Sequence, residues 1–292
     1  MLHRAVGWVC TIFDRCEAQW TRARTRQALA TGLVLLFLVL LGLVEVKPYV
    51  ALPMWLTVRV PASHFSAVAY VFTFLLVFEV ASLIFALAHS VAVSLGKQFE
   101  LLALILMREA FQEFGSAAEP IAWSGVAAAV PHALADMAGA LVVFVLLDLY
   151  YRGQQHRMIT TREDDQASFV CAKKVVSVAL LLLFVWLAVG SAPTLGRAGA
   201  GDFFPRFYTI LILSDILIVL ISLRFSSSFP VVFRNPGFAA ATLLVRVALS
   251  APPYVNAVLA SLAAAFALAL TAAYNRFGAT DAGAGASVAV TR

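Results

Sequence analysis

Eight ionisable side chains lie inside or beside long apolar stretches of this sequence, where uncharged residues are the rule. They are Glu79, His89, Arg108, Glu109, His132, Asp136, Asp215 and Arg246. A charge near the centre of a lipid bilayer costs several kcal/mol unless it is paired or reached by water. Residues of this kind therefore mark ion pathways, proton relays or buried ion pairs, and each is a functional candidate.

Four carboxylates and two imidazoles dominate this set, and they favour the passage of a cation or proton. We predict that a channel or transporter path for a small ion or solute is lined by Glu79, His132, Asp136 and Asp215. Arg108 and Arg246 are then counter-ions or gates. The alternative is a non-catalytic membrane subunit or scaffold, in which opposite charges such as Asp215 and Arg246 only fix the pairing of helices.

His132 and Asp136 are four residues apart and so lie on one face of a helix, a spacing that can bind a divalent cation or relay a proton. They are the metal-ligand candidates. The string PHALADMAGALVVF resembles the His-x-x-x-Asp helix of cation diffusion facilitators, and GKQFELLAL is similar to the third span of that family. The partner motif of the second span and the cytoplasmic metal-binding domain are absent, so the chain is not assigned to the family.

A third hypothesis is a haem-binding or membrane-embedded enzyme. His89 and His132 are the only histidines within apolar stretches, and two such residues can ligate a haem between helices. Zincin, lipid-phosphatase, P-loop and dinucleotide-binding signatures are absent. The sequence therefore defines no cofactor and does not favour an enzyme.

Composition predicts a chain whose surface faces lipid. Of 292 residues, 62% are hydrophobic and 13% are charged, whereas soluble domains have about 25% charged residues. The net charge of +5 comes mostly from basic residues between apolar runs, where orientation in a membrane explains them. We therefore expect the lipid bilayer and a small ion or solute as partners, and no nucleic acid. Self-association or a protein partner stays open.

The apolar runs predict an all-α transmembrane bundle of about eight membrane helices, of which one or two are re-entrant or interfacial. A run of about 20 residues crosses a bilayer. The clearest runs are 28–46, 65–95, 121–150, 175–189, 207–223 and 254–274. Residues 1–27 are predicted as a cytoplasmic amphipathic interfacial segment, 28–276 as the transmembrane domain and 277–292 as a flexible cytoplasmic tail.

Three stretches allow two interpretations each. Residues 96–114 mix charged and apolar side chains, and they either span with their polar side inward or lie at the interface. Residues 121–150 form one kinked span or a short segment followed by a full span. Residues 237–250 cross as a half-helix or re-enter, and Asn235 before Pro236 predicts a helix start.

Lysine and arginine place segments 1–27 and 151–174 on the cytoplasmic side of the inner membrane. Both segments can share a side only if an even number of crossings separates them. Residues 96–114 and 121–150 therefore either both cross, which gives eight spans, or neither crosses simply. The thirty mostly apolar residues of 121–150 favour eight spans, with both termini in the cytoplasm. Cys10, Cys16 and Cys171 fall in these segments, and they predict reduced thiols rather than a disulfide framework.

Overall fold

The structure is a computed structural model that describes residues 2–50, 53, 57, 60–61, 63–116, 122–154, 163–191, 203–223 and 229–290. All regular structure in this part of the chain is helical. The helices are α1 (Leu2–Trp20), α2 (Ala23–Val46), α4 (His64–His89), α5 (Val91–Glu113), α6 (Trp123–Val126), α7 (Val130–Gly153), α8 (Glu163–Ser191), α9 (Phe203–Leu223), α10 (Phe229–Ala248) and α11 (Val255–Val290).

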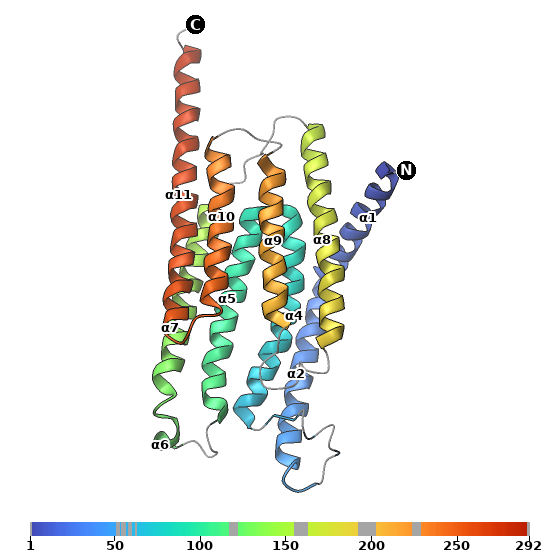
Figure 1. The fold of residues 1–292 in the computed structure, drawn as a ribbon, viewed down its shortest axis with the longest axis vertical. Coiled ribbons are helices and arrows are strands. Elements are labelled where there is room, and N and C mark those ends of the chain that lie inside the picture. The colour runs from blue at the N-terminus through green and yellow to red at the C-terminus, as the bar shows by residue number, and fades with distance from the viewer. Residues whose placement is uncertain are drawn as a thin grey trace.

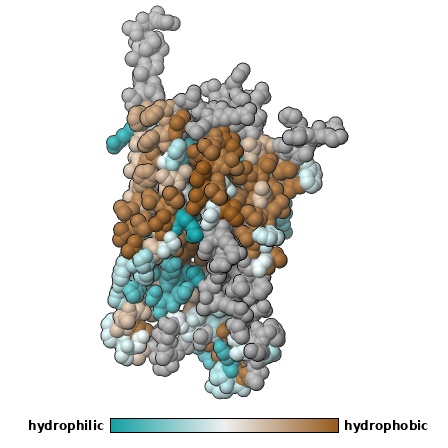
Figure 2. All heavy atoms as spheres, in the orientation of Figure 1, coloured by the Kyte–Doolittle hydropathy of each residue, from teal (hydrophilic) through white to brown (hydrophobic). Residues whose placement is uncertain are grey.

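Several of these helices are long and apolar enough to cross a bilayer. Within the described residues, five meet this criterion: Ala23–Val46, His64–His89, Val130–Gly153, Val170–Gly190 and Val255–Phe277. A broad hydrophobic band covers much of the bundle surface (Figure 2). Length, apolar composition and this outward-facing band agree with a helical membrane protein.

Helix α5 lies inside the bundle, where it packs against α4, α7 and α10 (Figure 1). It contains the stretch 96–114 almost entirely, and its buried side chains include Gln98, Leu102 and Leu106. Lys97 forms an ion pair with Glu100 one turn away, which offsets part of the local charge. The stretch is therefore enclosed by neighbouring helices. Helix α5 is not among the five helices that meet the spanning criterion, so its crossing of a bilayer stays a prediction.

A sharp corner at Ser90 separates α4 from α5. Ser90 has extended backbone angles (φ −154°, ψ 141°), and its hydroxyl oxygen accepts a hydrogen bond from the Ala92 amide. The predicted span 65–95 therefore ends at His89, several residues early. Such a cap satisfies one of the amide groups that a helix start leaves without a partner.

The two other ambiguous stretches also lie mostly in helices. Residues 121–150 form the short helix α6 followed by the full-length α7, which is the second of the two interpretations. Residues 237–248 belong to the 20-residue α10, which begins at Phe229, so the prediction that Asn235 starts a helix is wrong. Whether this segment crosses or re-enters stays a prediction. Pro236 lies inside α10, because neighbouring helices can satisfy the backbone group that proline leaves free.

Helix α11 runs through most of the predicted tail, whose mobility stays a prediction.

A disulfide joins α1 to α8, contrary to the expectation of separate reduced thiols. Cys10 and Cys171 are bonded with their Cα atoms 6.2 Å apart, although 161 residues separate them. Cys16 is free and exposed. The sequence could not reveal this pairing because only the packing of α1 along α8 brings the two residues together.

Gly139 allows α7 to lie directly on α11. A Cβ atom at this position would be 2.6 Å from the Ala257 Cβ and 2.9 Å from its Cα. We expect Gly139→Ala to push the helices apart and to lower the free energy of unfolding by about 1–3 kcal/mol. Thermal unfolding in detergent measures this effect. Gly32→Ala on α2 is the control, because no atom lies within 4 Å of that Cβ; equal losses from both changes would contradict the close approach.

Candidate functional site

Asp215 is a buried acidic residue that the structure brings into a polar contact. It lies near the middle of α9 and is 4% exposed. The Gln98 amide on α5 donates a hydrogen bond of 2.8 Å from Nε2 to Oδ2 of Asp215. Thr242 on α10 places its hydroxyl beside the same carboxylate. Three helices therefore meet at one buried carboxyl group.

A small pocket adjoins this contact. Its polar lining consists of Gln98, Thr242 and Arg246, and its other walls are apolar side chains of α4, α5, α9 and α10. The pocket measures about 20 Å³, which is room for about one water molecule. Arg246 lies two residues before the end of α10, so the pocket runs from the middle of the bundle towards that end.

A second acidic cluster surrounds Asn256 at the start of α11. Asn256 donates from Nδ2 to Glu109 Oε2 at 3.1 Å and to Asp136 Oδ1 at 2.8 Å. Its own Oδ1 accepts from the Ala257 amide at 2.6 Å. The amide thus bridges carboxylates of α5 and α7. Glu109 and Asp136 therefore share one donor, which offsets part of the repulsion between the two carboxylates.

The rim of this second cluster is more exposed. His132 Nδ1 lies 3.8 Å from Glu113 Oε2, and its ring centre is 5.0 Å from that of Tyr254. Below the hydrophobic band, a hydrophilic patch covers the lower parts of α5 and α7 and the connection from α10 to α11 (Figure 2). The cluster therefore lies near the ends of these helices, whereas Asp215 lies near the middle of α9.

The described residues contain no group of three or more His, Cys, Asp or Glu side chains that could hold a metal ion. His132 and Asp136 share a face of α7, but they have different partners. His132 faces Glu113, whereas Asp136 bonds to Asn256. The metal-ligand role predicted for this pair stays a prediction.

The two clusters are connected by one face of α5. Gln98 and Glu109 are eleven residues apart, which is about three turns, so both point to the same side of the helix about 16 Å apart. Ile105 lies between them and lines the pocket. The bridge between the clusters is therefore apolar, and only water could connect them.

Two other predicted residues lie elsewhere. Glu79 is half-buried on α4, and within the described residues it has no hydrogen bond or ion pair; it joins neither cluster. Arg108 donates from Nε to the Thr73 hydroxyl at 3.0 Å and so ties α5 to α4. The roles predicted for Glu79 and Arg108 stay predictions.

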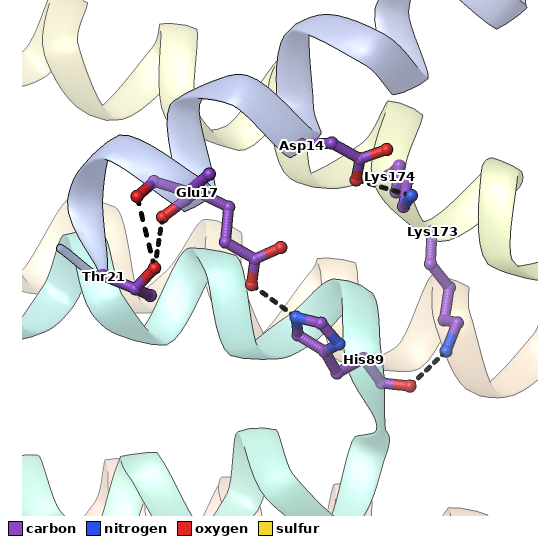
Figure 3. A network of polar contacts seen from close by, with 7 residues as sticks. Asp14, Glu17, Thr21, His89, Lys173 and Lys174 are labelled. Atoms are coloured by element: carbon purple, nitrogen blue, oxygen red, sulfur yellow. Dashed lines mark hydrogen bonds and ion pairs between the residues drawn. The ribbon is translucent and has the colours of Figure 1, made fainter.

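The structure places the two candidate haem ligands far apart. His89 ends α4 beside the start of α5, whereas His132 faces Glu113 at the end of α5. The 23 residues of α5 span about 34 Å, so the two imidazoles cannot bind one haem. His89 instead pairs with Glu17 of α1, and its backbone oxygen accepts a hydrogen bond of 2.7 Å from Lys173 (Figure 3).

Sequence reasoning missed Gln98 and Asn256, which organise the two clusters. Neither carries a charge, so neither was among the ionisable candidates. The eleven-residue spacing of Gln98 and Glu109 was a usable signal, since it places both on one face of a helix. For Asn256 the sequence offers no comparable signal, because its partners come from α5 and α7.

Replacing Asn256 tests the second cluster. Asn256→Leu leaves Glu109 and Asp136 without their common donor, and we expect a loss of about 2–4 kcal/mol at pH 8. The loss should shrink at pH 5, because protonation of one carboxyl group removes the repulsion. Thermal unfolding at both pH values checks this. A loss that is the same or larger in acid would contradict the arrangement.

Comparisons of this chain with protein families, with curated proteins and with solved structures found no match. What the chain does must therefore be inferred from its own geometry: a helical membrane protein with a buried carboxyl group beside a one-water pocket and an acidic cluster on the same face of α5.

Proposed function

We propose that the chain crosses the inner membrane eight times, with both termini in the cytoplasm. The spans would be α2, α4, α5 and α7 to α11, whose directions alternate along the chain (Figure 1). Exposed basic residues at the α1 end of the bundle support this orientation, among them Arg22, Arg24, Arg26 and Arg152. The end of the bundle that carries α1 would then face the cytoplasm, and the cluster around Asn256 would face outward.

We further propose that the protein passes a small cation, with the proton favoured, along the polar face of α5. The observation that carries this proposal is Asp215, a carboxyl group buried in the middle of α9 with one side-chain donor, Gln98, on its Oδ2 atom. A carboxyl group at membrane depth is costly and typically marks a proton or ion pathway. A pocket with room for about one water molecule is lined by Gln98 and Thr242, the two side chains beside this carboxylate, and Asp215 itself does not line it.

The acidic cluster would form the outer end of this route. Glu109 and Asp136 attract cations, and His132 lies at the rim beside Glu113. Arg246 lines the pocket between this end and Gln98. Its positive charge opposes hydrated metal cations in the pocket, which is the effect expected of a gate. A proton moving along a water molecule passes most easily.

Flux through proteoliposomes tests the proposal. The purified chain is reconstituted with an internal pH-sensitive dye, and a potassium gradient with valinomycin supplies an inside-negative potential. We expect internal acidification several times faster than in protein-free liposomes. Parallel vesicles with Na⁺ and K⁺ dyes separate proton from metal-ion passage. Rates equal to those of empty liposomes for all three ions would refute the proposal.

The rival function is a structural membrane subunit. Helix α2 favours it, because its apolar side chains such as Val34, Leu38 and Val39 face away from the rest of the chain. A second copy or a protein partner could cover this surface, although lipid explains it equally well. The rival predicts no flux and a complex that survives purification. Cross-linking from α2, followed by mass determination, distinguishes the two functions.

A further inference from the structure

Helix α1 is fixed to the bundle by contacts of several kinds. Phe13 is 1% exposed and lies against Phe85 of α4, with ring centres 5.6 Å apart. Trp20 donates a hydrogen bond of 2.9 Å from Nε1 to the Ser82 hydroxyl. This apolar side of α1 therefore packs against protein, and the interfacial location predicted for residues 1–27 stays a prediction.

Charged contacts surround this apolar core (Figure 3). Glu17 pairs with His89 at the end of α4, and Asp14 Oδ1 lies 2.6 Å from Lys174 Nζ of α8. Lys173, beside Lys174, donates to the His89 backbone oxygen at 2.7 Å. The contacts of α1 therefore converge on the corner between α4 and α5 and on the neighbouring turn of α8.

The disulfide lies within this group of contacts. Cys10 is one turn before Asp14 on α1, and Cys171 is close to Lys174 on α8. Both cysteines are partly exposed, so a small disulfide or thiol in solution can reach them. This end of the bundle carries the basic residues that indicate the cytoplasm, where a thiol pool keeps most cysteines reduced.

We propose that Cys10 and Cys171 are a site of reversible thiol–disulfide exchange that fastens α1 to α8 under oxidising conditions. The oxidant is a low-molecular-weight disulfide such as glutathione disulfide. One protein thiolate attacks it, forms a mixed disulfide and releases one thiolate. The second protein thiolate then attacks the mixed disulfide and releases the other. Two protein thiols lose two protons and two electrons, and the oxidant becomes two thiols.

Formation of the Cys10–Cys171 disulfide would also affect the start of α5. The polar contacts of α1 meet the residue that precedes the corner Ser90, and α5, with Gln98 on it, begins directly after this corner. In the reduced protein only non-covalent contacts hold α1, so it leaves the bundle more often. In the oxidised protein the disulfide limits this opening, because it excludes most conformations in which α1 is detached from α8.

Thiol labelling in whole cells tests the exchange. Intact cells are treated with diamide or left untreated, quenched in acid and labelled with a high-mass maleimide that shifts each free thiol on a gel. We expect three free thiols in untreated cells and one after diamide. Cys16→Ser should retain the loss of two thiols, whereas Cys10→Ser and Cys171→Ser should abolish it. Three thiols after diamide, or one in untreated cells, would overturn the proposal.

Proteolysis measures the fastening itself. Arg15 is exposed on α1, and trypsin can cleave there only when the helix opens. In purified full-length protein we expect cleavage after Arg15 to be roughly tenfold slower after oxidation than after reduction. The Cys10→Ser/Cys171→Ser variant is the control and should show no dependence on the oxidant. Equal rates in both states of the unmodified protein would contradict the fastening role.

Discussion

Asp215→Asn is expected to lower the proton flux of the reconstituted protein by roughly 100-fold. Asparagine has the size of aspartate and can still accept the hydrogen bond from Gln98, so the fold should persist. It cannot take up and release a proton, so the proposed route loses its central group. The dye-loaded proteoliposomes described above measure the effect at equal protein content.

A matched control for this change is available on α7. Asp148 pairs with Arg152 one turn away at 2.8 Å, and its side chain is 50% exposed. Asp148→Asn removes a carboxylate of the same chemistry from an accessible surface, and we expect no change in flux. If Asp215→Asn conducted as well as Asp148→Asn, Asp215 would have a structural role only.

Gln98→Leu is expected to lower stability strongly. The change leaves Asp215 buried without its side-chain donor from α5, and we expect a loss of about 3 kcal/mol in the free energy of unfolding. Thermal unfolding in detergent, compared with the unmodified protein, measures the loss. A variant as stable as the unmodified protein would show that water or another group satisfies the carboxylate.

The double variant separates stability from function. Gln98→Leu combined with Asp215→Leu removes both polar partners, and we expect it to regain much of the stability because an apolar pair packs in the same space. This double variant should show no proton flux, since position 215 no longer holds a proton acceptor. Losses that simply add would contradict direct coupling between the two residues.

The helical architecture was largely predictable from apolar run lengths. Bilayer thickness requires about 20 apolar residues for each crossing, and this requirement located α2, α7, α8, α9 and α11. Boundaries were less certain where local features compete with hydropathy. Ser90 interrupts an apolar run without any loss of hydrophobicity, and Pro236 lies within a helix that the sequence suggested it would begin.

Candidate site residues were predictable only as single positions. Intramembrane charge identified Asp136 and Asp215, which the structure places in separate clusters. Their partners Gln98 and Asn256 are neutral amides from distant segments, and only the packing of α5 with α9 and of α7 with α11 brings them together. The Cys10–Cys171 bond depends on the packing of α1 with α8 in the same way.

The whole account requires that α5 crosses the membrane, because this helix carries both Gln98 and Glu109. Side-specific labelling tests this crossing in cells that produce Gln112→Cys in a Cys10→Ser/Cys171→Ser background. Gln112 is exposed near the end of α5, and the native Cys16 is exposed at the opposite end of the bundle. We predict that a membrane-impermeant maleimide labels the introduced thiol in intact cells and Cys16 only after permeabilisation. Labelling of both thiols from the same side would contradict the proposed topology and the route along α5.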